Sequence, residues 1–229
     1  MKKIVIVLMC ALLVLPIGCA NMNKTTQGGL LGGGAGAAVG AGIGALLGKG
    51  KGAAIGAALG SAVGAGAGVL IGRKMDKKAE ELAQELENAK VEKVTDVNGL
   101  EAIKVTFDSG LLFQSGKSAL SSASKAELTN FASKMRDMAD TDITICGHTD
   151  NTGSAEVNER LSLQRANAVG DYLKSLGIGS SRLKSEGKSF TEPIADNKTA
   201  EGRAQNRRVE VFITANEAMV QKAEAGTLE

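Results

Sequence analysis

The clearest alternation of apolar and polar positions in this chain is at Ile143 and Ile145, which alternate with a threonine and a cysteine. Such alternation predicts a half-buried strand, and Gly147 directly after it lets the backbone leave the sheet. Ser154 suits the N-cap of a helix that runs to about Leu176, one residue before a glycine. This stretch therefore predicts a strand, a polar loop and a long helix.

The predicted long helix has an apolar face that would pack on the sheet, and Arg165 falls at the centre of that face. A guanidinium is always charged and is costly to bury alone, so Arg165 needs a carboxylate, carbonyl groups or the carboxylate of a ligand. Asp150 is the nearest acidic candidate in sequence. A structural Asp150–Arg165 ion pair and a ligand-binding pair are both compatible with this pattern. The apolar positions are Val157, Leu161, Ala168, Val169, Tyr172 and Leu176.

A hairpin is predicted before this unit, because Asn98 and Gly99 form the dipeptide that a two-residue turn favours. Its strands would cover residues 91–97 and 100–107.

Ser124 and Glu127 then predict a capping box at the start of a helix. The apolar stripe of that helix is Leu128, Phe131, Met135 and Met138. The order of elements predicts an α/β fold, a two-layer α+β sandwich spanning residues 91–215. Its remaining parts are a weaker strand at 182–186, a loop at 193–197, a short helix capped by Thr199, a last strand at 209–213 and a flexible tail at 216–229.

Several motifs over residues 105–213 resemble the OmpA-like peptidoglycan-binding domain, which peptidoglycan-associated lipoproteins and flagellar stator proteins share. One departure is that Gly187 is followed by Ser189, where the family often has a second glycine. The motifs are Gly147-His148-Thr149-Asp150-Asn151-Thr152-Gly153-Ser154, Asn158, Leu161-Ser162, Arg165-Ala166 and Glu201-Gly202-Arg203-Ala204-Gln205-Asn206-Arg207-Arg208-Val209-Glu210.

This resemblance implies that Asp150 and Arg165 hold the diaminopimelate residue of a peptidoglycan stem peptide. It also implies Thr149, Asn158 and Arg208 as further peptidoglycan-binding residues. Peptidoglycan is accordingly the expected partner, and no cofactor is expected.

Residues 28–72 change abruptly in composition to glycine and small apolar residues, with glycine recurring at every fourth position in two runs. Lys49 and Lys51 separate the runs, which predicts a helical hairpin. Each arm of about twenty residues would be about 30 Å long, enough to cross a bilayer. The spacing resembles a glycine zipper, in which glycines let two helices approach closely. A disordered linker is the alternative.

A phosphate-binding loop is excluded in this segment, because Gly48-Lys49 lacks the required glycine spacing and the following serine or threonine.

Residues 73–90 are charged and predict an amphipathic connecting helix that could self-associate, so a homo-oligomer is a possible assembly. Its stripe consists of Met75, Ala79, Leu82, Leu86 and Ala89.

Residues 1–18 predict a signal peptide: two lysines precede an apolar run that is too short to span a bilayer. The run ends at Gly18-Cys19, which resembles a bacterial lipobox, although Pro16 replaces its usual aliphatic residue. Cys19 would then carry acyl chains (palmitate among them), followed by a linker over residues 19–27. Ala20 and Asn21 are not the aspartate that resembles an inner-membrane retention signal. A lipid anchor in the outer membrane, with the C-terminal domain in the periplasm, is therefore expected.

The composition narrows the function further. A formal net charge of +2 and an aromatic content of 3% do not favour nucleic-acid binding. Cys146 would be the free thiol left after processing, so no intrachain disulfide is predicted, and its place favours a half-buried strand residue. Cys146, His148 and Asp150 suggest a catalytic triad or metal cluster, but side chains on one strand do not automatically converge, and no nucleophile elbow surrounds them. We therefore predict no catalytic residue and no metal.

Two functions remain to be compared. The first is an outer-membrane lipoprotein that tethers the membrane to the cell wall through diaminopimelate. The second is a membrane-inserting or oligomer-forming glycine-zipper protein in which the wall-binding domain is only a tether.

Overall fold

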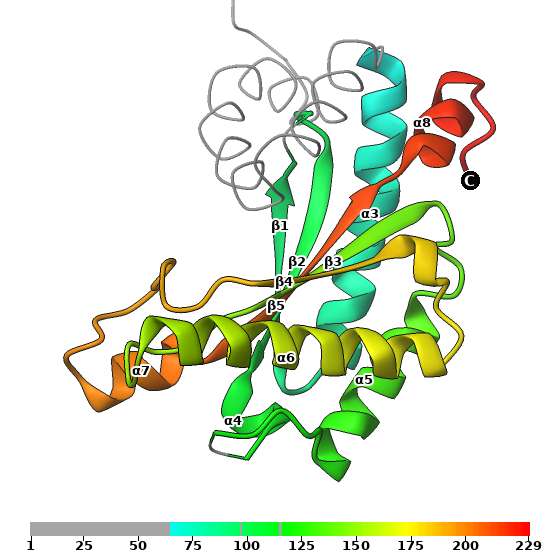
Figure 1. Ribbon diagram of the computed structural model, residues 1–229. Helices are drawn as coiled ribbons and strands as arrows, with labels where there is room; N and C mark the ends of the chain where they lie inside the picture. The colour runs from blue at the N-terminus through cyan, green and yellow to red at the C-terminus, as the bar shows by residue number, and fades with distance from the viewer. Residues whose placement is uncertain (1–64, 97, 115) are drawn as a thin grey trace, which may run out of the picture.

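The computed structural model describes residues 65–229 apart from 97 and 115, and a five-stranded mixed sheet lies at its centre (Figure 1). The strand order is β1-β2-β5-β3-β4; β3 and β4 are parallel and the other neighbours are antiparallel. The strands are β1 (Ala89–Thr95), β2 (Glu101–Asp108), β3 (Thr141–Gly147), β4 (Leu183–Gly187) and β5 (Arg208–Ala215).

Most of the helices pack against one face of the sheet. Inward-facing residues of β2, β3 and β5 form one core with apolar residues of α3, α5 and α6. This arrangement confirms the predicted two-layer α/β fold. The helices are α3 (Ala65–Glu85), α4 (Ser109–Leu112), α5 (Ser122–Lys134), α6 (Ala155–Ser175), the 3-10 turn η1 (Ser180–Arg182), α7 (Ala200–Asn206) and α8 (Glu217–Glu224).

Part of the predicted chain organisation lies outside the described residues. The signal peptide (1–18), the linker (19–27) with Cys19, and residues 28–64 of the glycine-rich segment all belong to this part. None of the helices within the described residues has the length and apolar character needed to cross a membrane.

Helix α3 is an integral layer of the fold and not only a connection. It begins inside the glycine-rich stretch and ends before the predicted limit, because Ala89 and Lys90 already belong to β1. Its apolar stripe is buried in the common core, and Leu82 is fully buried. Lys78 also ties α3 to the segment after α5, because its ammonium donates to the carbonyl of Lys134 at 3.0 Å and to the carboxylate of Asp137 at 2.9 Å. Helix α3 is therefore part of the domain.

The C-terminal residues form a helix where the sequence predicted a flexible tail. Asn216 caps α8 by accepting a hydrogen bond from the backbone of Met219. Met219, Val220 and Ala223 are buried, and α8 contacts α3. The prediction was wrong for residues 217–224 because this short apolar stripe has a partner in α3, which the tail's polar composition does not reveal.

Two local predictions also need correction. The β1–β2 connection is not a two-residue turn, since Asp96 donates its backbone N–H to the carbonyl of Leu100 and its carboxylate accepts from the N–H groups of Asn98 and Leu100. Gly99 has φ of 75°, which is the left-handed conformation that glycine supplies.

The cap of α5 is Ser121 and not Ser124. Ser124 is fully buried and donates to the carbonyl of Leu112 at 2.8 Å, while Glu127 accepts from the backbone of Asn88. Both residues of the predicted capping box therefore make tertiary contacts. The apolar stripe that follows them is buried as expected.

Candidate functional site

The loop between β3 and α6 is fixed by backbone hydrogen bonds on both sides. The N–H of His148 donates to the carbonyl of Arg208, and the N–H of Thr149 donates to the carbonyl of Ser189, both at 2.9 Å. Ser162 on α6 accepts from the N–H of Ser189 at 3.0 Å. Ser189 has φ of 50°, so it takes the left-handed conformation at the position where the family often has glycine. Hydrogen bonds within the protein therefore hold the loop that carries Asp150.

Helix α6 lies unusually close to the ends of β3 and β4. A Cβ atom on Gly147 would overlap the carbonyl oxygen of Ser162, and one on Gly187 would lie 2.7 Å from the Ser162 hydroxyl. This approach rotates the buried face of α6 relative to the predicted one. Val157 is 45% exposed, whereas Asn158 is buried. The helix turns polar residues toward the strand ends because these residues hold the site loops.

The predicted limits of α6 agree with the structure. Ser154 caps its N-terminus by accepting from the backbone of Val157, and the C-cap is Leu176. Gly177 follows with φ of 93°.

Asp150 lies at the start of this loop and is 8% exposed. One carboxylate oxygen accepts from the N–H of Thr152 at 2.8 Å, and the other accepts from Nη1 of Arg207 at 2.7 Å. Burial alone would raise the pKa of Asp150, but the hydrogen bonds from Arg207 and Thr152 outweigh it and hold that pKa below its ordinary value. Asp150 is therefore a carboxylate at neutral pH.

Arg165 reaches the same region from α6 and is 3% exposed. Its Nε donates to the carbonyl of Lys117 at 3.1 Å, and its guanidinium lies 5.2 Å from the centre of the Phe113 ring. Its Nη1 is buried with no hydrogen-bond partner among the described residues. Burial, followed by repulsion from Arg207, lowers the pKa of Arg165. The guanidinium is thus incompletely satisfied by the protein.

The direct Asp150–Arg165 ion pair considered in the sequence does not form. Asp150 pairs with Arg207. Arg207, whose side chain is 40% exposed, was missed as a candidate. Its place in the motif Asn206-Arg207-Arg208 offered two adjacent arginines, of which Arg207 is the C-cap of α7 and Arg208 is the first residue of β5.

Arg208 points to the other side of β5 and is 3% exposed. Its Nε donates to Glu210 at 2.8 Å, and its Nη2 donates to the carbonyl of Glu192 at 3.1 Å. The structure therefore does not bring Arg208 together with Asp150 as the prediction grouped them.

Thr149 and Asn158 flank Asp150 in different ways. The hydroxyl of Thr149 is buried and, like Nη1 of Arg165, has no partner among the described residues. Asn158 donates from its amide to the carbonyl of Thr152 at 2.9 Å, so it holds the turn that also donates to Asp150. Buried polar atoms are nearly always hydrogen-bonded, so these two unpaired atoms are exceptions that call for a partner.

The arrangement suits a ligand that carries both an ammonium and a carboxylate group. A carboxylate such as Asp150 accepts from an ammonium, and a guanidinium such as Arg165 donates to a carboxylate through charge-assisted hydrogen bonds. A free amino-acid head presents both groups on one carbon atom.

The alternative chemistry at Cys146 and His148 meets a physical obstacle. Cys146 is fully buried, and burial raises the pKa of its thiol to about 12, so it stays protonated and is a poor nucleophile. His148 is 1% exposed and lies 3.4 Å from Glu210. Across residues 65–229 without 97 and 115, no three His, Cys, Asp or Glu side chains are grouped as metal ligands.

Two known protein families match parts of this chain. Residues 112–207 match the OmpA family, and residues 1–76 match the YMGG-like Gly-zipper family. The chain carries an OmpA-like domain. The match includes Asp150, Arg165 and Arg207, and the glycine-zipper match extends into α3.

Curated relatives of the OmpA-like domain are envelope proteins. Omp38, an outer membrane protein of Acinetobacter baumannii, is 43% identical over 111 residues, which are 48% of this chain and 31% of that protein. The probable lipoprotein YiaD of Escherichia coli is 38% identical over 112 residues, 49% of this chain and 51% of YiaD. The peptidoglycan-binding protein ArfA of Mycobacterium bovis is 39% identical over 112 residues, 49% of this chain and 34% of ArfA. The chain thus spans about half or less of these relatives.

Solved structures share the fold of the OmpA-like domain. The cell wall anchor of the T6SS from Pseudomonas aeruginosa has a TM-score of 0.52 at 29% identity, covering 62% of this chain and 97% of that chain. A putative MotB-like protein from Desulfovibrio vulgaris has a TM-score of 0.55 at 26% identity, covering 64% and 94%.

Proposed function

We propose that this protein binds peptidoglycan non-covalently through its OmpA-like domain and links the outer membrane to the cell wall. The carrying observation is the buried guanidinium of Arg165, whose Nη1 has no partner among the described residues although Asp150 lies in the same region. The names of the relatives support the proposal, since ArfA is called a peptidoglycan-binding protein.

The proposed ligand group is the free amino-acid end of diaminopimelate in the stem peptide. Its carboxylate would receive hydrogen bonds from Arg165, and its ammonium would donate to Asp150. Arg207 would share Asp150 with the ammonium, because each carboxylate oxygen can accept more than one hydrogen bond. Thr149 would add its hydroxyl, and Asn158 would hold the loop.

The proposed anchoring in the outer membrane depends on residues 1–27. A lipobox-like Gly18-Cys19 supports acylation of Cys19 and anchoring in the outer membrane, with the OmpA-like domain in the periplasm. The likeness to a probable lipoprotein, YiaD, agrees with this topology.

A pull-down with purified sacculi tests the wall-binding step. Asp150→Asn and Arg165→Ala should each weaken binding about 10- to 150-fold, because a hydrogen bond to a charged group contributes about 1.5–3 kcal/mol. Free diaminopimelate should compete with the sacculi. Asp171→Asn and Arg160→Ala, exposed positions on the same helix, are the matched controls. Binding that survives both site substitutions in folded protein would remove these residues from the function.

The match of residues 1–76 to a Gly-zipper family favours a second function, in which the glycine-rich segment forms oligomers or enters a membrane. In that case Gly40→Leu with Gly60→Leu should abolish detergent-resistant oligomers of residues 20–72 and leave sacculus binding intact. Oligomers unaffected by both substitutions would argue for a passive linker.

A further inference from the structure

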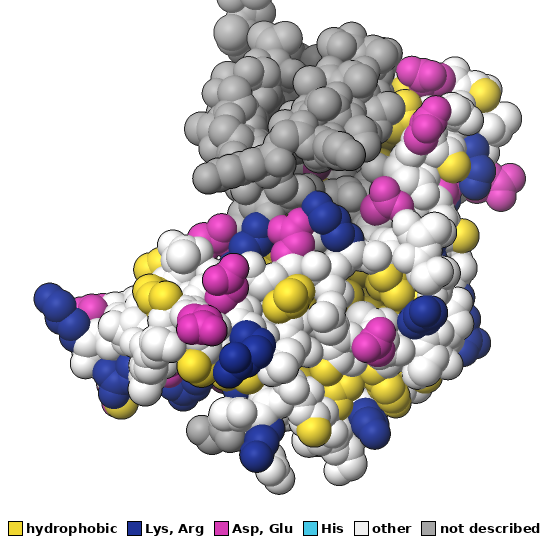
Figure 2. Space-filling view, viewed as in Figure 1, with side chains coloured by type: hydrophobic (Ala, Val, Ile, Leu, Met, Phe, Trp, Pro, Cys, Tyr) yellow, Lys and Arg dark blue, Asp and Glu magenta, His cyan; other side chains and the backbone are white. Residues whose placement is uncertain are grey.

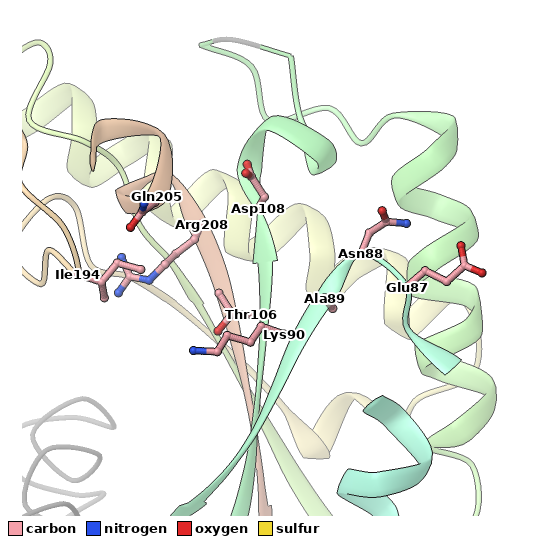
Figure 3. A pocket seen from close by; sticks show the side chains of 9 residues that line it. All are labelled: Glu87, Asn88, Ala89, Lys90, Thr106, Asp108, Ile194, Gln205 and Arg208. Atoms are coloured by element: carbon pink, nitrogen blue, oxygen red, sulfur yellow. The ribbon is translucent and has the colours of Figure 1, made fainter. Parts of the chain in front are cut away.

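A cavity of about 520 Å³ opens on the sheet face opposite α3, α5 and α6, beside the start of β5 (Figure 3). Lys90 of β1, Thr106 and Asp108 of β2, and Arg208 of β5 line it. These strands lie next to one another in the sheet, so the cavity floor is regular backbone. Ile194 closes one side, from the loop before α7.

The cavity has no net preference for charge. Lys90 and Arg208 contribute two cations, and Glu87 and Asp108 contribute two anions. Arg208 is already bonded to Glu210 and to two backbone carbonyls, and Lys90 is paired with Glu92 at 2.8 Å. A neutral ligand therefore fits better than a phosphate or a free cation.

Uncharged hydrogen-bonding groups remain available in the cavity. The side chains of Asn88, Thr106 and Gln205 line it, and within the described residues none of the three makes a hydrogen bond. An amide offers both donors and an acceptor, and a hydroxyl offers both roles in one atom. Such a set matches hydroxyl and acetamide groups.

The apolar wall of the cavity is held in place. Ile194 is 58% exposed, yet its backbone N–H donates to Oδ1 of Asn206 at 2.8 Å. Asn206 is fully buried and also donates to the carbonyl of Ala195 at 2.9 Å. The exposed isoleucine thus has a fixed backbone, and a ligand that packs on it pays little ordering entropy.

The cavity and the Asp150 site lie on the two sides of one dipeptide. Arg207 bonds Asp150, and the next residue, Arg208, lines the cavity. The carbonyl of Arg208 accepts from His148, two residues before Asp150. The Cα atoms of Arg207 and Arg208 are about 3.8 Å apart, so the two sites flank the start of β5. One extended ligand could occupy both.

We propose that the cavity is an accessory subsite for an N-acetylated sugar of the glycan chain, whose stem peptide occupies the Asp150 site. This inference rests on the proposed function. The sugar hydroxyls and acetamide bond Asn88, Thr106 and Gln205, and the apolar side of the pyranose ring packs on Ile194. A sugar is neutral, and it is joined covalently to the stem peptide, so both ends bind as one ligand.

Calorimetry with the full mature protein tests this subsite with two ligands. One is a stem peptide that contains diaminopimelate, and the other is the same peptide attached to its N-acetylated disaccharide. We expect the wild type to bind the sugar-bearing ligand about tenfold more tightly. Thr106→Val and Gln205→Ala should remove that advantage and leave the affinity for the bare peptide unchanged. Gln84→Ala, an exposed glutamine on α3, is the matched control.

Each contrary outcome has its own meaning. Equal wild-type affinity for the two ligands overturns the sugar subsite and leaves the peptide site standing. Thr106 and Gln205 variants that weaken both ligands equally also overturn it, because the residues would then act on the peptide site. Wild-type protein that binds neither ligand refutes the proposed function itself.

Discussion

Replacing Arg165 by methionine should weaken wall binding about 10- to 150-fold and change the free energy of unfolding by less than about 3 kcal/mol. Arg165 is 3% exposed, and the described residues give it one backbone carbonyl and one aromatic ring as partners. Its Nη1 has no partner among the described residues, so the fold leaves part of the guanidinium unsatisfied. Asp150, the nearest candidate, is paired with Arg207.

The stabilising and destabilising contributions of Arg165 oppose each other and overlap in size. Its hydrogen bond to the carbonyl of Lys117 contributes about 1.5–3 kcal/mol, and the contact with Phe113 about 0.5–2 kcal/mol. Desolvation of the buried charge costs several kcal/mol, and the unpaired Nη1 about 1–3 kcal/mol. Methionine keeps contact with the ring. We expect the unfolding free energy to change by less than the about 3–5 kcal/mol that breaking a buried ion pair costs.

Urea denaturation followed by far-UV circular dichroism on residues 65–229, together with sacculus binding, checks this prediction. Arg160→Met, exposed on the same helix, should affect neither measurement. Destabilisation of Arg165→Met by more than about 3 kcal/mol would refute the reasoning, because breaking a buried structural ion pair costs about that much.

Three further predictions concern other parts of the molecule. Burial alone would raise the pKa of Glu210, but His148 and Arg208 outweigh it and lower that pKa to about 2. The wild type should therefore lose about 3 kcal/mol of stability as the pH falls from about 4.5 to about 2, and Glu210→Gln should lack this slope. Gly147→Ala should destabilise the domain by about 1–3 kcal/mol or more, since its Cβ overlaps Ser162. Cys19→Ser should leave the protein without acyl label.

Each of these three has a direct check. For Glu210, the sign follows because the unfolded chain binds the proton at higher pH than the folded one, and identical acid slopes in both proteins would contradict it. For Gly147, Gly66→Ala on α3 is the control, since a Cβ there meets nothing within 4 Å. A Gly147 variant as stable as that control would exclude the close approach. Radiolabelled fatty acid on Cys19→Ser would exclude the lipobox.

The strands and long helices could be predicted because their periodicity follows burial on one face. The limits of α6 were found from Ser154 and Gly177, each of which has a local backbone reason to be there. The rotation of its buried face was not found. Asn158 and Ser162 are polar, and only their contacts with the loops explain their burial. A hydropathy pattern contains no information on such tertiary contacts.

The site shows the same limit. Asp150 and Arg165 stood out because one follows a strand and the other interrupts an apolar face. Arg207 did not, because choosing between it and Arg208 requires knowing where β5 begins. The packing of α3 and α8 was not predicted for a related reason. Both helices bury apolar stripes against each other and the sheet, and the sequence of a stripe does not show which element covers it.

The surface of the domain agrees with its modest charge. Figure 2 shows Lys and Arg side chains interspersed with Asp and Glu side chains over the face that carries α6. A nucleic-acid-binding surface requires a basic patch or stripe, so this face does not have that character.

The burial of α3 fixes how much chain is left between the domain and a membrane. The charge-free stretch 52–72 would be about 31 Å long as a helix, close to the thickness of a hydrocarbon core of about 30 Å. Ala67 and Ile71 are buried in the domain, so residues 65–72 cannot enter lipid while the domain is folded. The thirteen positions from 52 to 64 reach about 20 Å as a helix, which falls short of a crossing. The burial of the first turns of α3 therefore withholds eight of these twenty-one charge-free positions, 65–72, from any membrane-spanning helix while the domain is folded.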